Sequence, residues 1–411
     1  MIAIVGMVVF AVTLAACGSS SSSTSTSSTT AGVAKGECGS VPTKSLPPDP
    51  SKTLAGLPKS VQSLYLGFAT PVQTSSWANW EPKLSGKATI GLSFMNLVSP
   101  FQATIYESML SELKSNPAVG NVVSYTAASP TDIAGQLQQF QSLIQQHVDM
   151  IVLLAPVVSP FVPLVEQAEK AGIPTVSLVG AVDSPGVVSV AANTWQGLAE
   201  PGASILKAIG QKGNVLLVHG VPGSEIDSEE FAGFDDLLAA CPDVKVAGEV
   251  NGEYNPPVIK SSVLQFLSTH TEPIDAVFQS GTMATSIMQA FEQAGKTVPP
   301  VIDVAAQKGS LAYWNENSEA GYSGGGSVAG AVAVANQGNR IVSRMLAGQG
   351  PKVNAIIWPN PVVSADNLES FVEPGWTLAT PGAAENPPST YITEQQLDAL
   401  FNHPDRKVPG S

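Results

Sequence analysis

The sequence has few cysteines and few basic residues. Three cysteines among 411 residues exclude a disulfide-dense scaffold and a zinc fold that needs several cysteines. Nineteen Lys and Arg against 33 Asp and Glu give a net charge of −14, and no dense basic run occurs outside the short tail at Arg406-Lys407. Since proteins hold a phosphate backbone with clustered Lys and Arg, we expect no nucleic-acid partner.

Motifs for metal and cofactor binding are scarce as well. None of the four histidines stands in an HExxH or HxH arrangement, and a Walker A loop is missing. A glycine cluster at 321–330 precedes a predicted helix but lacks the G-x-G-x-x-G spacing of a dinucleotide site. Close backbone packing and a flexible connection both remain open for it. We expect no metal, no cofactor and no catalytic residue, hence no enzyme.

The first 17 residues resemble a lipoprotein signal peptide. Residues 2–16 form one apolar run of signal-peptide length, which ends in the lipobox-like Leu14-Ala15-Ala16-Cys17. Residues 18–37 follow as a Ser/Thr-rich tether. The resemblance implies that a lipid on Cys17 anchors the protein at the outer, extracytoplasmic face of the cell membrane. The alternative is a buried helix that ends in an ordinary cysteine.

The other two cysteines are Cys38 and Cys241. In an oxidising compartment they could pair and fasten the N-terminal extension to the body of the protein. Because the sequence does not give the distance between them, a disulfide and two free thiols both remain open.

From residue 87 onward, short apolar runs alternate with helical stripes. The run at 150–155 (MIVLLA) is apolar throughout, which is typical of a parallel strand covered on both faces. The alternation predicts an α/β protein with two doubly wound parallel-sheet lobes. The predicted strands are 88–94, 121–125, 150–155, 175–178, 187–190, 214–219, 244–250, 276–279 and 298–304, with an extended segment at 353–363. The predicted helices are 100–113, 130–146, 162–171, 195–209, 224–240, 257–269, 282–294 and 328–347.

Two segments rich in Pro and turn residues flank this body. We interpret residues 38–86 as an N-terminal extension and residues 376–411 as a C-terminal tail, both lying on the surface of the lobes. Trp77 and Trp80 are the side chains expected to dock the extension onto a lobe.

Residues 87–363 resemble the type I periplasmic binding proteins, especially the ribose/galactose-type sugar-binding members of ABC importers. Four segments carry the resemblance: IGLSFMNLVSPFQ at 90–102, VDMIVLLAP at 148–156, AGIPTV at 171–176, and DAVF at 275–278 before Met283-Ala284. Ala191-Ala192-Asn193-Thr194 falls at the family's first crossing between lobes.

The resemblance implies two lobes joined by a three-segment hinge, with crossings near 192–194, 325–328 and 352–355. The first lobe then comprises 87–192 plus 328–352, and the second 193–327 plus 353–365. Gly324-Gly325-Gly326 would lie at the second crossing, where glycines absorb large backbone changes cheaply; a simple tight turn is the alternative.

The resemblance also implies where a ligand would bind, and there the sequence departs from the family. Val179-Gly180 stands where the family places an Asp-Arg pair, and Ser228 stands near the expected arginine. Ser280-Gly281-Thr282 and Ala305-Ala306-Gln307 replace further charged clamps for hydroxyl groups. The candidates for ligand contact are the remaining aromatic and polar residues: Phe94, Asn96, Ser99, Phe101, Gln102, Asn193, Trp195, Ser228, Tyr254, Asn255, Gln279, Ser280, Thr282 and Gln307.

Each candidate also has a purely structural interpretation. Phe101 suits a core position, Ser99 and Asn193 suit helix caps, and 225–230 suits a solvated first helical turn. We expect a monomeric, lipid-anchored solute-binding protein that delivers a small sugar-like or related molecule to an ABC permease. A cleft with so few charged clamps should prefer a more apolar, hydroxyl-poor or cationic solute. The alternatives are a sensor that presents its ligand to a membrane signalling receptor and, further off, an α/β enzyme.

Overall fold

A computed structural model describes residues 37–408 of the chain. The predicted signal peptide, the lipidation site Cys17 and all but the last residue of the predicted tether lie outside the described residues. Within 37–408, no helix is both long enough and apolar enough to cross a membrane.

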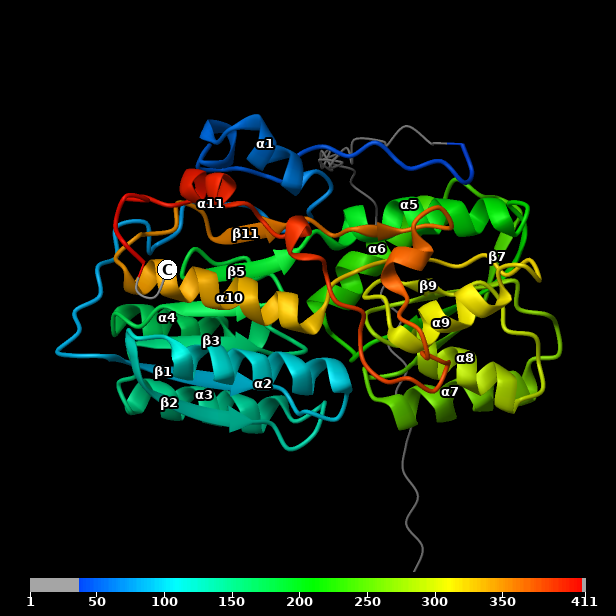
Figure 1. The fold of residues 1–411 in the computed structure, drawn as a ribbon, viewed down its shortest axis with the longest axis horizontal. Coiled ribbons are helices and arrows are strands. Elements are labelled where there is room, and N and C mark those ends of the chain that lie inside the picture. Colours follow the sequence, from blue (N-terminus) through cyan, green and yellow to red (C-terminus); the bar gives the residue numbers. More distant parts are fainter. Residues whose placement is uncertain (1–36, 409–411) are drawn as a thin grey trace, which may run out of the picture. The chain divides into compact units, whose positions relative to one another are not determined.

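The first lobe is built on a six-stranded sheet in which all strands are parallel, in the order β11-β5-β4-β3-β1-β2. Its strands are β1 (Ala88–Phe94), β2 (Val119–Thr126), β3 (Met150–Leu154), β4 (Thr175–Leu178), β5 (Val187–Ala192) and β11 (Ala355–Trp358). Helices α2 (Pro100–Ser115) and α10 (Ala331–Leu346) cover one face, and α3 (Ile133–Gln145) and α4 (Val162–Lys170) the other (Figure 1).

The apolar strand β3 shows why this sheet needs helices on both faces. Val152 packs into the core under α2 and α10, while Ile151 and Leu153 pack into the core under α3 and α4. Because side chains alternate along a strand, an apolar run is stable only where both faces are covered.

The second lobe is also a mainly parallel α/β lobe, but its strands form two smaller sheets. Strands β7-β6-β8 and β12-β10-β9 form two three-stranded sheets, which a parallel bridge between Val277 and Val301 connects. All pairs are parallel except the pair of β10 with β12. The strands are β6 (Gly213–His219), β7 (Val244–Asn251), β8 (Ala276–Gln279), β9 (Ile302–Asp303), β10 (Gly325–Ser327) and β12 (Val362–Val363). The helices are α5 (Thr194–Ala208), α6 (Glu225–Leu238), α7 (Pro256–Thr269), α8 (Ala284–Gln293) and α9 (Lys308–Asn317). The predicted fold class is confirmed.

The chain crosses between the lobes at Asn193, at 328–330 and at 359–361. The second and third crossings lie side by side, because the Val328 amide donates to the Pro361 carbonyl oxygen at 2.8 Å. The third crossing comes later than the predicted 352–355. Residues 353–365 therefore do not all belong to the second lobe: the apolar segment 355–358 pairs with β5 of the first lobe, and only β12 joins the second.

The glycines at 324–326 serve close packing and form no tight turn. Gly325 and Gly326 lie in β10, which precedes the second crossing. A Cβ atom on Gly326 would stand 2.5 Å from the Asp303 carbonyl oxygen, and one on Gly324 would stand 2.9 Å from the Trp314 ring. Any side chain at these positions would push β10 away from its neighbours.

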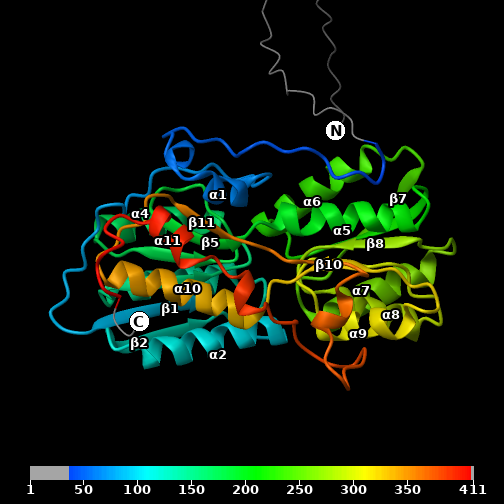
Figure 2. The same cartoon turned by 45° about the horizontal axis from the view of Figure 1, so that its top comes forward.

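The N-terminal extension contacts both lobes (Figure 2). A disulfide joins Cys38 to Cys241 of the second lobe. Further along, the Tyr65 hydroxyl donates to the Ala355 carbonyl oxygen and the Trp77 indole NH to the Gly186 carbonyl oxygen, both at 2.7 Å, in the first lobe. The short helices of the extension are η1 (Leu54–Gly56), α1 (Lys59–Gln62) and η2 (Ser63–Tyr65). A further short helix, η3 (Ser159–Phe161), belongs to the first lobe.

The C-terminal tail also contacts both lobes. After η4 (Leu368–Phe371) against α9, the tail passes the second crossing, where Gly330 donates its amide to the Asn386 side chain at 2.6 Å. It then continues through η5 (Pro388–Thr390) to α11 (Glu394–Leu400). There Glu394 pairs with Arg340 and Arg344 of α10, with N–O distances of 2.6 Å. The extension and the tail thus add two further connections to the three crossings of the hinge.

Candidate ligand-binding cleft

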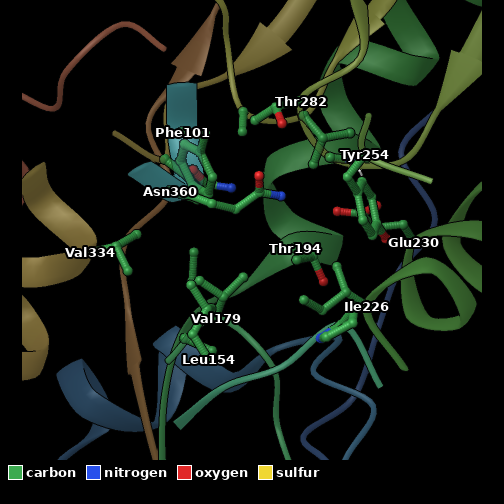
Figure 3. A pocket seen from close by; sticks show the side chains of 18 of the residues that line it. Phe101, Leu154, Val179, Thr194, Ile226, Glu230, Tyr254, Thr282, Val334 and Asn360 are labelled. Atoms are coloured by element: carbon green, nitrogen blue, oxygen red, sulfur yellow. Dashed lines mark hydrogen bonds between the residues drawn. The ribbon is translucent and has the colours of Figure 1, made fainter. Parts of the chain in front are cut away.

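The carboxyl ends of both sheets face one cavity between the lobes. From the first lobe, Leu154 lies at the end of β3 and Val179 follows β4; from the second, Tyr254 follows β7 and Thr282 follows β8 (Figure 3). The cavity and the open solvent at its mouth together comprise about 840 Å³ that protein atoms leave unfilled. In open α/β sheets ligands bind at these strand ends, because there the loops diverge and leave a crevice.

The wall of the cavity is almost entirely apolar. Most of its surface comes from aliphatic and aromatic side chains such as Phe101, Ile226, Val334 and Trp358. Among the described residues, no Lys, Arg, His or Asp lines it, and Glu230 is its single residue with a carboxyl group. Such a wall favours an apolar solute body and offers no cation to an anionic ligand.

Glu230 is buried in α6, with 1% of its surface exposed. The Gly281 amide donates to its Oε2 atom at 3.1 Å. Burial raises the pKa of this carboxyl to about 8, although a hydrogen bond from Ser280 opposes the rise; the nearby Asp227 adds to it. At neutral pH the unliganded protein therefore holds Glu230 mostly as the neutral acid.

Tyr254 stands beside Glu230 and is held in an uncommon backbone conformation. Its φ of 51° lies in the left-handed region, and its hydroxyl pairs with Ser280 Oγ at 3.0 Å and Ser224 Oγ at 3.3 Å. A Cβ atom on Gly220 would stand 2.1 Å from the Tyr254 ring, so only glycine leaves room for it. Backbone strain of this kind persists where the surroundings fix it, often at functional sites.

Asn360 contributes a polar atom at the third crossing. Its side-chain NH₂ group donates to Ser327 Oγ at 3.1 Å, while its buried Oδ1 atom has no partner among residues 37–408. Thr194, at the first crossing, also lines the cavity (Figure 3). The hinge therefore places two polar side chains beside the cavity, and one of them is an unpaired acceptor.

The sequence profile of the periplasmic binding protein domain matches residues 90–350, more than half of the chain. This chain belongs to the periplasmic binding protein family. The predicted resemblance to type I members is confirmed by two-lobed solved structures of the same fold.

Two curated relatives are similar to this chain in sequence. The xylitol-binding protein of Mycolicibacterium smegmatis is 24% identical over 247 residues, which cover 59% of this chain and 68% of the relative. The ribose import binding protein RbsB of Bacillus subtilis is 27% identical over 255 residues, covering 61% of this chain and 80% of the relative.

Solved structures share the fold at lower identity. An ABC transporter solute binding protein from Bacillus halodurans with bound myo-inositol has a TM-score of 0.62 and 19% identity, covering 70% of this chain and 98% of that one. One from Thermobispora bispora has a TM-score of 0.61 and 23% identity, covering 71% of this chain and 92% of that one.

Four of the fourteen predicted contact residues line the cavity: Phe101, Gln102, Tyr254 and Thr282. Ser280 lies directly behind them, bonded to Tyr254. The Gln102 side chain also accepts from the Ser99 amide at 3.0 Å in the capping box of α2. Its amide oxygen is therefore already engaged.

Several of the predicted polar contacts instead hold the backbone. Ser99 and Asn193 cap α2 and α5, and Asn193 also donates to the carbonyl oxygens of Leu64 and Leu66 in the extension. Gln279 donates to the Ile302 carbonyl oxygen at 2.9 Å, and Gln307 accepts from the Thr285 amide at 2.8 Å. Amide side chains near strand ends satisfy buried backbone groups here.

Two predicted aromatic contacts lie elsewhere. Phe94 is fully buried in the core, edge-on to Tyr106 at 5.4 Å between ring centroids. Trp195 packs on Gly67 of the extension, with Lys44 Nζ 5.8 Å from its ring centroid. The sequence alone did not reveal that the extension covers this face of α5.

The remaining three predicted contacts also lie outside the cavity lining. Asn96 is buried after β1 with both side-chain amide atoms lacking a partner among residues 37–408. Asn255 stands at the start of α7, and Ser228 donates to the Ser224 carbonyl oxygen at 3.0 Å on an exposed part of α6.

The segment 225–230 only partly fits the alternative interpretation as a solvated helical turn, because Ser228 is exposed but Glu230 is buried. Glu225 accepts hydrogen bonds from the amides of Val158 and Ser159 of the first lobe, both at 2.7 Å, and from the Ser159 hydroxyl. Glu230 faces the cavity. A signal for Glu230 was present, because it shares a helical stripe with Ile226, Phe234 and Leu237.

One short motif has the sequence of a nucleophile elbow but not its structure. Residues 321–325 read GYSGG and match G-x-S-x-G, but Ser323 leads directly into β10. A nucleophile elbow is a turn from a strand into a helix. Within 37–408, no group of three or more His, Cys, Asp or Glu residues is placed to hold a metal ion.

Proposed function

We propose that this protein is the extracytoplasmic solute-binding component of an ABC importer and that it holds one small molecule in the cleft between its lobes. The observation that carries the proposal is the cavity at the carboxyl ends of both sheets, beside the hinge crossings. Family membership supports it, and so do the curated relatives, whose names describe xylitol binding and ribose import.

The lobes supply a mechanism for transport. A ligand that contacts both lobes stabilises the closed form, and a permease that binds the closed form better couples loading to delivery. The contact of Glu225 with the Val158 and Ser159 amides is one interaction that closure makes and opening breaks.

Anchoring and partners belong to the same proposal. The lipobox-like Leu14–Cys17 supports removal of residues 1–16 and a lipid on Cys17, which then starts the mature chain, with residues 18–37 as the tether. The mature protein would then act as a monomer at the outer face of the cell membrane, next to its permease.

The solute should carry fewer hydroxyl groups than a pentose or hexose. Such sugars need several charged or amide partners. The cavity offers Gln102, whose oxygen is engaged, with Glu230, Tyr254, Thr194, Thr282 and Asn360, against a wall that is otherwise apolar. Every hydroxyl left unpaired in a closed cleft costs about 1–3 kcal/mol.

The test is the mass of the compound that co-purifies with the protein, released by denaturation and then titrated back by calorimetry. We expect one molecule bound per chain. Ala305→Phe, which fills the cavity, should weaken binding at least about tenfold, whereas Val246→Phe on the exposed part of β7 should leave it unchanged. Turnover of the compound, or equal binding by both variants, would contradict the proposal.

A ligand-presenting sensor is the second candidate. A fructose-binding periplasmic domain of a hybrid two-component system shares this fold, with a TM-score of 0.58 and 19% identity. Uptake of the labelled compound by cells that lack the gene separates the two functions: an importer component is required for uptake, whereas a sensor is required only for the transcriptional response.

A further inference from the structure

We propose that the solute is a compact apolar molecule with a single protonated amine, whose nitrogen is held between the carboxyl group of Glu230 and the hydroxyl of Tyr254. This inference rests on the proposed function and names the class of ligand for the same cleft. Its basis is the pairing of an apolar wall with one buried acid and no base.

The two polar groups converge on one point of the wall. Figure 3 shows Glu230 and Tyr254 side by side, across the cavity from Val334 and Phe101. Both form a hydrogen bond with Ser280, and the Gly281 amide donates a hydrogen bond to Glu230 Oε2. An ammonium group between them would find one carboxylate and one hydroxyl acceptor in place, with little side-chain reorganisation.

The charges around Glu230 favour a cation and oppose an anion. Asp227 and Glu229, on the same helix, add negative potential. His219 pairs with Asp227 at 2.9 Å and does not line the cavity. The loop after β8 brings only Ser280 and Gly281 to Glu230, and the loop after β7 brings Tyr254. Within the described part of the chain, the opposite wall carries no charged residue.

A buried carboxyl group is unfavourable in such a cavity, because its ionised form is costly to desolvate. A glutamine of the same size could hydrogen-bond a hydroxyl ligand without this cost. Only a cationic ligand uses the charge, because its binding turns the neutral acid into a paired carboxylate. The remaining wall, with Leu154, Val179, Ile226 and Trp358, fits the hydrocarbon body of the same ligand.

The experiment compares three probes of one shape: cyclohexylamine, cyclohexanol and cyclohexanecarboxylate, each titrated calorimetrically into the ligand-stripped full-length protein at pH 7. We expect the amine to bind at least about tenfold more tightly than the alcohol, and the carboxylate to bind more weakly than both. Amine binding should release a proton from Glu230, so that the measured heat changes with the ionisation enthalpy of the buffer.

Glu230→Gln should bring the amine to within about threefold of the alcohol, because the charged partner is lost while the shape is kept. The control is Glu166→Gln, which removes one carboxyl group at an exposed site on α4, outside the cavity lining, and should keep the amine preference. Equal melting temperatures at pH 5 check that both variants fold.

Three results overturn the inference. The first is an alcohol that binds as tightly as the amine, and the second is a Glu230→Gln protein that keeps the full amine preference. The third is binding of xylitol or myo-inositol in place of all three probes, which would leave the solute-binding function standing. Absence of any solute, the co-purified compound included, that stabilises the protein would overturn the proposed function itself.

Discussion

Glu230 illustrates how a single residue can contradict the ordinary meaning of its sequence context. It closes an acidic segment at the start of α6, where carboxylates usually face water and favour the helix dipole. Helical geometry instead turns it inward with Ile226 and Phe234, and burial keeps it protonated near neutral pH. Glu230 therefore lowers the stability of the folded state near neutral pH, as residues at functional sites often do.

Replacement of Glu230 by Gln should change how stability depends on pH. The folded-state pKa of about 8 lies above the ordinary value of 4.5, so folding favours the protonated form. The stability that this preference provides is complete below about pH 4.5 and is lost as the pH rises toward 8, by at most ~1.4 kcal/mol per pH unit.

In denaturant unfolding without ligand, Glu230→Gln should match the wild type at pH 5 and exceed it increasingly up to pH 8. Glu166→Gln, at an exposed site on α4, serves as the control. A difference between Glu230→Gln and wild type that stays constant from pH 5 to pH 8 would contradict this prediction.

At the scale of elements, the first turn of α6 connects the lobes. The Glu225 carboxylate accepts the backbone amides at the start of η3, so a helix of one lobe caps a helical segment of the other. Charge-assisted hydrogen bonds of this kind are stronger than neutral ones, and this contact exists only while the lobes are together.

Replacement of Glu225 by Gln should therefore weaken ligand binding without contact to the ligand. We expect a loss of about five- to thirtyfold in affinity, equivalent to ~1–2 kcal/mol, with faster ligand dissociation, because the closed form loses stability. Stopped-flow dissociation of the co-purified compound measures it. Ser228→Ala, exposed on the same helix, should behave as wild type; an unchanged rate in Glu225→Gln would exclude this role.

At the scale of the whole described body, two terminal segments add connections to the three-segment hinge. The extension is joined to the second lobe by the disulfide and docked on the first lobe through Tyr65 and Trp77. The tail contacts the second crossing through Asn386 and the first lobe through Glu394. Movement of the lobes must therefore deform segments that the family resemblance did not imply.

The double variant Cys38→Ser/Cys241→Ser should lower the free energy of unfolding by ~2–5 kcal/mol, because the disulfide closes a long loop in the unfolded chain. Denaturant unfolding with and without a reductant measures the effect. The reductant should destabilise the wild type and leave the double variant unchanged. Two reactive thiols at Cys38 and Cys241 in unfolded, unreduced protein would contradict the disulfide.

Several predicted strands agree with the structure closely, and others are missing for identifiable reasons. β1, β4 and β8 have the predicted bounds because compact apolar runs end at polar or turn residues. β10 consists of Gly325, Gly326 and Ser327, which carry no hydrophobic pattern, so only its neighbours make it a strand. Of the predicted strand at 298–304, only Ile302–Asp303 forms a strand, and Val301 adds a single bridge to Val277.

The two-lobed α/β fold could be predicted from the order of residues alone, because apolar periodicity indicates which faces must be buried. It also placed Phe101, Gln102, Tyr254 and Thr282 near the cleft through the resemblance to a family. Which polar side chains are already engaged follows from the packing of distant segments. Asn193, Gln279 and Gln307 satisfy backbone groups far along the chain, whereas Glu230 lines the cavity and Asn360 Oδ1 has no partner among residues 37–408. The partners of a side chain are set by contacts between distant segments, and no local pattern records them.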